Sequence, residues 1–332
     1  STKDTNDVSH FTNEIFSDQF AGRLGQAIND TNGGNDWINL AAMTGNVTAG
    51  LARGASLTRD ADGTSRTFAR IGNTSDIENI VSGDGNDSLT GNAQANMLVG
   101  GRGADTLMGL GGNDTLEGGA DADSLDGGTG SNTAAYGLSR AAVQVNLTSG
   151  AATGGDAAGD QFANIQNLSG SKHGDALTGT TGANVLSGLA GDDTLTGNGG
   201  TDSLYGGDGN DVMTGDASTA LFDGGAGDDF VDYSASAGPV NVDLSASRFV
   251  NVEGLIGSSG ADTLTGDSGN STLIGGGGSD VLNGGGGSNS ASYRTATTGV
   301  TASLLASGGN TGDAAGDSYA NIASLEGSAQ AD

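Results

Sequence analysis

The chain carries one large apolar residue in every nine over long stretches. Residues 100–126 divide into GGRGADTLM, GLGGNDTLE and GGADADSLD, each with leucine at its eighth place (Leu107, Leu116 and Leu125). A period of nine matches neither the helical period of about 3.6 residues nor the alternation of a β-strand. Glycine supplies the positive φ angles that tight turns need. We therefore interpret each nonapeptide as a turn of six residues followed by a strand of three.

The nonapeptides form arrays that are separated by longer connectors. The arrays cover residues 82–135, 170–232, 257–292 and 327–332. The connectors cover residues 136–169, 233–256 and 293–326. The alternating segments VQVNL and VNVDL within them predict strands, so we expect the connectors to be further coils of the same structure. A degenerate repeat and a connector occupy residues 31–81, and residues 1–30 remain unassigned.

If successive turns lie on opposite edges, two nonapeptides make one full coil and stack their eighth-place residues in a narrow core. This predicts an all-β fold, a parallel β-roll or β-solenoid. Burying one leucine contributes roughly 1.5–3 kcal/mol, whereas fixing each backbone residue costs roughly 1–2 kcal/mol. One apolar side chain in nine residues does not offset that cost, so the fold needs another source of stability.

The charge of the chain indicates a cation as that source. Forty acidic residues face eleven basic ones, which gives a formal net charge of −29. Such a charge opposes compaction and argues against nucleic acid or anionic lipid as a partner. The chain has no cysteine for disulfides. It also has no apolar run of the roughly 18–20 residues that a membrane span needs, so we expect no membrane insertion.

The cation that fits the repeat is Ca²⁺. Glycine-rich turns expose backbone carbonyls, and the sixth place of most nonapeptides adds a carboxylate, which together form a hard oxygen ligand set. Only His10 and His173 could serve zinc or copper as soft ligands. The predicted calcium ligands are Asp87, Asp105, Asp114, Asp123, Asp175, Asp193, Asp202, Asp211, Asp229, Asp262 and Asp280, with Asn96, Asn132, Asn184 and Asn289 as weaker ones.

The repeat resembles the GGxGxDxUx pattern of the RTX (repeat-in-toxin) proteins, which carry hemolysin-type calcium-binding nonapeptides. GGRGADTLM and GGDGNDVMT match it in full, and most other nonapeptides match it in part. The resemblance implies a parallel β-roll that holds several calcium ions between turns on the same edge. It also implies export through type I secretion machinery and folding in external calcium, hence a secreted, extracellular or cell-surface location.

Two functions agree with this resemblance. The first is a calcium-binding structural module of a secreted or cell-surface bacterial protein, with self-association or cell-surface polysaccharide as possible further partners. The alternative is the C-terminal carrier region of a secreted RTX enzyme, such as a serralysin-like protease or a lipase, whose catalytic domain lies outside this chain. We expect no enzyme activity within these residues, because they contain no HExxH or other catalytic constellation.

Three further motifs have a plain structural explanation, and a fourth leaves open whether it binds a metal ion. Ser268 in GDSG lies within a nonapeptide and lacks a histidine partner in the same context. His173 replaces a turn glycine, and DADGTS at 60–65 lacks the closing glutamate of an EF-hand, so we interpret both as surface turns. Asp156 and Asp160 in the first GDAAGD either bind another ion or solvate a loop.

Sorting the sixth-place residues by alternate repeats predicts two unequal edges. One edge is expected to carry only aspartate: Asp87, Asp105, Asp123, Asp175, Asp193, Asp211, Asp229, Asp262 and Asp280. The opposite edge is expected to be mixed: Asn96, Asp114, Asn132, Asn184, Asp202, Ala220, Ser271 and Asn289. Because charge count tunes calcium affinity, the first edge should bind calcium more tightly.

Overall fold

The computed structural model describes residues 8–12, 26–28, 35–61, 64–71, 77–216, 218–305 and 307–332. These residues form strands, turns and three short 3₁₀ helices: η3 (Gly155–Ala157), η4 (Ser307–Gly309) and η5 (Gly312–Ala314). The described part contains no helix that is long and apolar enough to cross a membrane. The chain divides into two compact units, residues 1–177 and 178–332. The predicted all-β parallel roll is confirmed in each unit.

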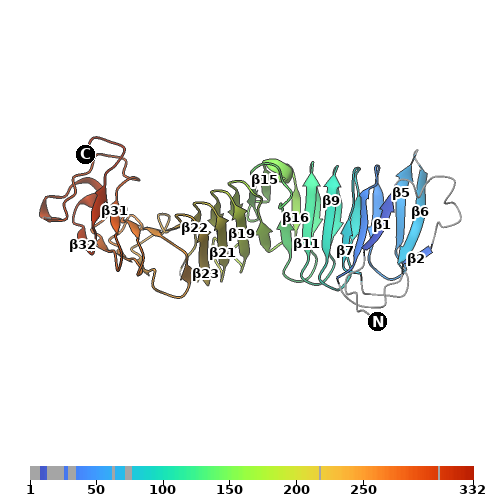
Figure 1. Ribbon diagram of the computed structural model, residues 1–332, viewed down its shortest axis with the longest axis horizontal. Coiled ribbons are helices and arrows are strands. Elements are labelled where there is room, and N and C mark those ends of the chain that lie inside the picture. The colour runs from blue at the N-terminus through green and yellow to red at the C-terminus, as the bar shows by residue number, and fades with distance from the viewer. Residues whose placement is uncertain are drawn as a thin grey trace. The chain divides into compact units, whose positions relative to one another are not determined.

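The first unit is built from two layers of strands. One layer follows the order β1 (Val8–Thr12), β3 (Trp37–Ala42), β7 (Asn79–Val81), β9 (Met97–Arg102), β11 (Thr115–Ala120), β13 (Thr133–Ala135) and β17 (Asn167–Ser169). The other follows the order β16 (Gln161–Ala163), β12 (Ser124–Asp126), β10 (Thr106–Met108), β8 (Ser88–Thr90), β4 (Val47–Gly50), β5 (Ser56–Ala61), β6 (Thr64–Ile71) and β2 (Gln26–Ile28). The strands of these layers pair in parallel except for β4 with β5 and β5 with β6. Figure 1 shows β7, β9 and β11 side by side.

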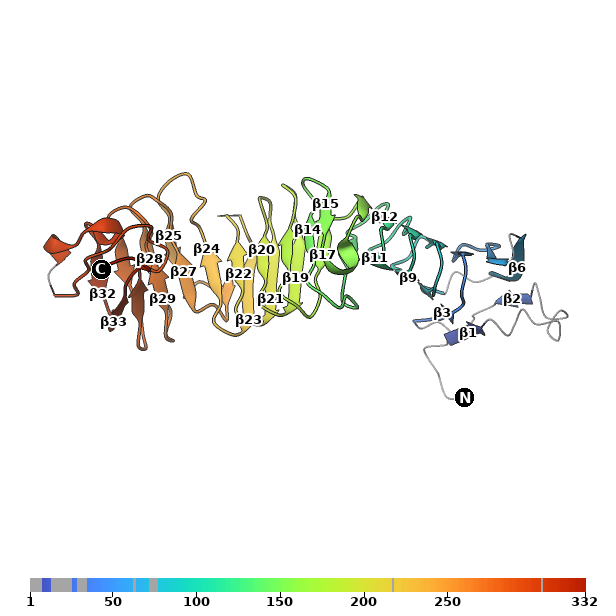
Figure 2. The ribbon, with the colours of Figure 1, turned by 90° about the horizontal axis from the view of Figure 1, so that it is seen from above.

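The second unit is also built from stacked strands, which belong to three hydrogen-bonded groups. The longest group is β20 (Thr194–Thr196), β22 (Val212–Thr214), β24 (Phe230–Asp232), β27 (Gly254–Ile256), β29 (Thr272–Ile274), β31 (Ser290–Ser292) and β33 (Ser324–Glu326). The others are β19 (Val185–Ala190), β21 (Ser203–Asp208), β23 (Leu221–Ala226) and β26 (Phe249–Val250), and β25 (Asn241–Asp243), β28 (Thr263–Thr265), β30 (Val281–Asn283) and β32 (Ser318–Ala320). Figure 2 shows β20, β22 and β24 in succession.

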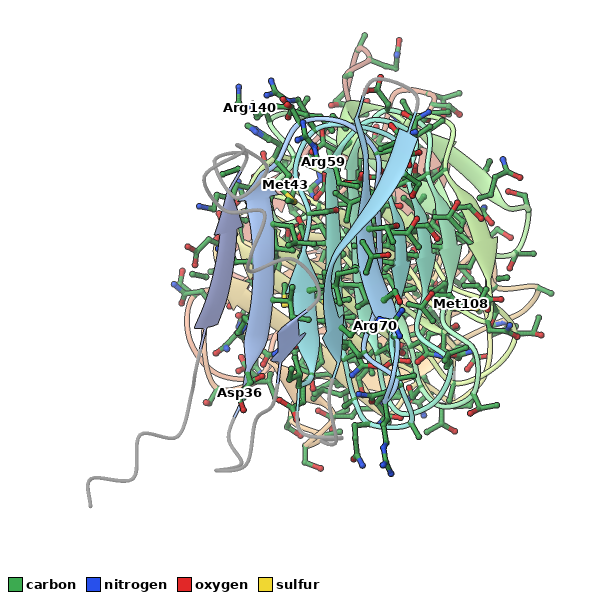
Figure 3. All side chains as sticks on the ribbon, turned by 90° about the vertical axis from the view of Figure 1, so that its right-hand side faces the viewer. Asp36, Met43, Arg59, Arg70, Met108 and Arg140 are labelled. Carbon is green, nitrogen blue, oxygen red and sulfur yellow. The ribbon has the colours of Figure 1, made fainter. Side chains whose placement is uncertain are left out.

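The register of the strands shows that two nonapeptides make one coil. Leu107 in β10 pairs with Leu89 on one side and Leu125 on the other, each 18 residues away, and both pairings are parallel. These three leucines are at most 1% exposed. Their neighbours at the seventh and ninth places alternate to the outer surface, as for Met108 (Figure 3). The core is therefore a single file of eighth-place side chains in each layer.

The connectors add strands to the same layers. Phe162 of β16 pairs with Leu125, and Tyr319 of β32 pairs with Leu282, so the connector side chains continue the eighth-place file. Two further connector strands, β14 (Gln144–Asn146) and β15 (Ala151–Thr153), pair antiparallel. The DADGTS segment lies where β5 and β6 form an antiparallel hairpin, with Asp60 opposite Ser65. Residues 62–63 lie outside the described residues, so the plain turn stays a prediction.

Candidate metal centre: the turn edges

The turns of one edge stack closely, with backbone carbonyls between them. The second and fourth places take positive φ, as at Gly101 (113°) and Gly103 (112°). A Cβ atom on Gly103 would lie 2.2 Å from the carbonyl oxygen of Gly85, in the turn 18 residues earlier. A side chain on Gly103 is therefore disfavoured by the carbonyl oxygen of that earlier turn as well as by the backbone conformation. Each gap between successive turns is thus lined by carbonyl oxygens.

The sixth-place side chains form a ladder along the edge. The aspartates and asparagines at the sixth place in the first three arrays are at most 3% exposed. Within an array, one carboxylate oxygen accepts the backbone N–H of the sixth-place residue 18 positions earlier: Oδ1 of Asp105 accepts from Asp87 at 2.7 Å, and Oδ1 of Asp229 accepts from Asp211 at 2.8 Å. This bond fixes the side chain, because an ionised carboxylate is a strong acceptor for a backbone N–H. Its second oxygen is left facing its own turn.

That second oxygen has no hydrogen-bond donor in eight of the predicted aspartates. They are Asp87, Asp105, Asp114, Asp123, Asp202, Asp211, Asp229 and Asp280. The oxygen lies against the first-place glycine: a Cβ on Gly100 would be 2.2 Å from Oδ2 of Asp105. Leaving a buried polar atom unsatisfied costs about 1–3 kcal/mol, and more when it is charged. These eight oxygens therefore need a partner that the protein does not supply.

The pKa values of these carboxyl groups also indicate that the charged carboxylates lack a partner. Burial raises the pKa of Asp105 to about 7 and that of Asp123 to about 8, and neighbouring aspartates add to the rise. Burial likewise raises the pKa of Asp280 to about 7. Negative charge is therefore unfavourable on this edge unless a cation lies close by. Arg102 does not provide it, since it pairs with the exposed carboxylate of Asp84 at 2.8 Å.

The ligand chemistry of the gaps fits Ca²⁺. Among the described residues, no three Asp, Glu, His or Cys side chains converge on one point. A cation in a gap would therefore take one or two carboxylate oxygens and complete its shell with backbone carbonyls. Such an all-oxygen set suits Ca²⁺ and does not suit zinc or copper. The residues that would hold it are the eight aspartates above and the turn carbonyls that face them.

The asparagines at the sixth place are bonded differently. Oδ1 of Asn132 accepts the N–H of Asp114 at 3.0 Å, and its amide nitrogen donates to the carbonyl of Asn164 at 3.1 Å. Asn289 makes the equivalent bonds to Ser271 and Asn321. In these two residues the amide nitrogen occupies the place of the second carboxylate oxygen and is satisfied within the protein, so a donor stands where a cation would need an acceptor. In Asn96 and Asn184 the amide oxygen lies there instead and accepts the N–H of the second-place residue, Asn92 or Thr180.

The first aspartates of the second and third arrays are also satisfied by the protein. Ser258 donates its N–H to Oδ2 of Asp262 at 2.6 Å and its hydroxyl to Oδ1 at 2.9 Å. Ser171 makes the same two bonds to Asp175. Both aspartates were predicted ligands. Their carboxylates sit in the ladder but need a cation less than the interior ones do.

The prediction of one continuous aspartate edge holds in the first array and is wrong for the third. Asp87, Asp105 and Asp123 precede β8, β10 and β12, which share one layer. In the second unit, however, β24 pairs with β27 and β27 with β29, so Glu253 and then Ser271 follow Asp229 on its edge. Asp262 and Asp280 precede β28 and β30 and lie on the other edge. The middle connector, residues 233–256, makes one full coil of 24 residues and returns to the layer of β24. The next strand, β28, therefore lies in the other layer, and Asp262 lies on the edge opposite Asp229.

Two aspartates of the ladders lie outside the nonapeptides. Oδ1 of Asp160 accepts the N–H of Asp123 at 2.9 Å, and Oδ1 of Asp317 accepts that of Asp280 at 2.8 Å. Sequence reasoning left Asp160 open and did not single out Asp317; their signal was the repeated GDAAGD. Asp156 is half-buried in η3.

Of the other residues considered, His173 and Ser268 lie on the surface and Asp36 is buried. The side chains of His173 and Ser268 are exposed in turns at the start of the second array and within the third. Asp36, at the sixth place of the degenerate repeat, immediately precedes β3 and is buried at one end of the strands (Figure 3). Its backbone N–H donates to Oε2 of Glu78 at 2.9 Å, so the ladder already begins there.

The fold and its edges define a class of protein: a parallel β-roll whose stacked turns present buried carboxylates and carbonyls to metal ions. The RTX calcium-binding nonapeptide repeat family matches this chain in four copies, at residues 73–107, 99–134, 178–213 and 256–291. The chain therefore contains RTX calcium-binding nonapeptide repeats over these segments. A search of curated proteins found no match to the chain.

Proposed function

We propose that this chain is a structural module of a secreted or cell-surface protein, and that it folds on binding several calcium ions after export. The observation that carries the proposal is the row of buried Oδ2 atoms without a protein donor. Each of these carboxylates is held in place by a backbone N–H, so the site is formed by the fold itself. The folded state therefore binds calcium, and the unfolded chain does not form the site.

The magnitude of calcium linkage supports this role. A site with a dissociation constant of about 10⁻⁴ M, in about 10 mM calcium, stabilises the folded state by about 2.7 kcal/mol. A few such sites together match the stability of an ordinary domain, roughly 5–15 kcal/mol. At the far lower calcium of a cytoplasm the same sites contribute almost nothing. This difference suits passage through a type I secretion channel as an unfolded chain.

We propose no enzymatic role for these residues. In the described turns the sixth-place carboxylates are used in the ladder, and the exposed Ser268 lies in a turn of the third array. A catalytic domain elsewhere in a longer protein agrees with the same module, which would then act as its carrier.

Calcium removal tests the proposal. Far-ultraviolet circular dichroism of the full chain should show β structure in about 10 mM calcium, and an excess of chelator should abolish most of it. Magnesium, which demands a tighter octahedral shell, should not restore the signal at the same concentration. A β signal that persists unchanged in chelator at pH 8 would refute calcium-dependent folding.

A further inference from the structure

Two aspartate ladders end on a connector aspartate whose second oxygen already has a protein donor, whereas the ladder of the second array ends on Glu253. Asp160 and Asp317 follow Asp123 and Asp280 in their ladders, and both are 1% exposed, like the interior aspartates. By position they are ladder members. By bonding they differ, because their second oxygen has a protein donor.

That donor is a buried tyrosine hydroxyl. Tyr136 donates to Oδ2 of Asp160 at 2.9 Å, and Tyr293 donates to Oδ2 of Asp317 at 2.8 Å. In the eight aspartates named above the same atom has no donor. A hydroxyl hydrogen directed at a carboxylate supplies, over a short distance, part of the positive charge that a cation would supply.

The arrangement occurs twice, in separate units of the chain. In each copy the tyrosine precedes its aspartate by 24 residues. Both tyrosines are at most 2% exposed, and the last strand of the connector anchors both: Tyr136 N–H donates to the carbonyl of Ser169 and Tyr293 N–H to that of Glu326. The hydroxyl therefore reaches the carboxylate from a fixed backbone position in both copies.

We infer that Tyr136 and Tyr293 take the place of a calcium ion at the end of an aspartate row. The connectors at residues 136–169 and 293–326 then close their rows without metal, and in these rows calcium is confined to the gaps between interior aspartates. The inference rests on the proposed function, because it presupposes that the interior gaps bind calcium. It makes the connectors the part of each unit that does not need the ion to satisfy its carboxylates.

The number of bound ions tests this directly. Tyr136→Phe keeps the buried ring and removes only the hydroxyl, which leaves Oδ2 of Asp160 without a donor. We expect this variant to bind one calcium ion more than the unaltered chain in equilibrium dialysis at saturating calcium. Tyr205→Phe is the matched control: it removes the same atom from a tyrosine of β21 that is 37% exposed. It should leave the count unchanged.

A second variant tests whether the additional ion depends on the charged carboxylate of Asp160 or on the change in packing at Tyr136. In Tyr136→Phe/Asp160→Asn the amide nitrogen can donate to a nearby carbonyl, as that of Asn132 does, so the count should return to that of the unaltered chain. Three results for Tyr136→Phe would overturn the inference: an unchanged count, a lower count, or a chain that stays unfolded in calcium. If the unaltered chain binds no calcium, the proposed function itself is wrong.

Discussion

Asp105→Asn should change the stability of the β-roll in opposite directions with and without calcium. The substitution keeps the shape of the side chain and the acceptor for the N–H of Asp87, now 2.7 Å away. It replaces the second oxygen, which has no donor, by an amide nitrogen. Asp105 stands between the gaps toward Asp87 and toward Asp123, so one substitution alters two predicted calcium sites.

The expected changes in stability, with and without calcium, follow from the properties of the site. With calcium at 100 times its dissociation constant, each site contributes about 2.7 kcal/mol, so loss of both would cost up to about 5 kcal/mol. Without calcium, the rise in the pKa of Asp105 from 3.8 to about 7 corresponds to about 4 kcal/mol of penalty for the ionised form at pH 8. Asparagine carries no charge and avoids that penalty.

The assay is urea unfolding followed by circular dichroism at pH 8, in calcium and in chelator. We expect Asp105→Asn to lower the free energy of unfolding in calcium and to equal or exceed the unaltered chain in chelator. Asp84→Asn is the control, because it removes one exposed carboxylate that lies outside the ladder. A loss of similar size in both conditions would show that Asp105 acts only through packing, and the reasoning would fail.

Two further predictions concern protons and glycine. Because burial raises the pKa of Asp123 to about 8 and that of Asp280 to about 7, the calcium-free fold is favoured below the ordinary pKa of 3.8, and this stability is lost as the pH rises through about 7–8. A chelator-treated chain should therefore gain β structure on acidification, and a loss of β signal between pH 8 and pH 5 would contradict this. Gly103→Ala should destabilise the first unit strongly, measured as a lower melting temperature in calcium, because its Cβ would lie 2.2 Å from the carbonyl oxygen of Gly85. Gly137→Ala, where a Cβ meets nothing within 4 Å, should leave the melting temperature nearly unchanged.

Local chemistry accounts for what could be predicted from the sequence. The period of nine, with glycine in the turn and Leu107 at the eighth place, allows one economical coil, and that coil has the observed register of 18 residues. The same pattern brings Asp105 to a turn edge beside glycine. These features depend only on residues close in sequence and on the stacking of identical units, so the sequence alone determined them.

The tertiary structure decided three things that depend on distant residues. It showed that the middle connector closes a full coil, which moves Asp262 to the opposite edge from Asp229. It also brought Tyr136 against Asp160 across 24 residues. Finally, it showed which carboxylates already have two partners. Spacing within a repeat does not determine how many coils a non-repeating connector makes, nor which side chain the next coil brings against a buried oxygen.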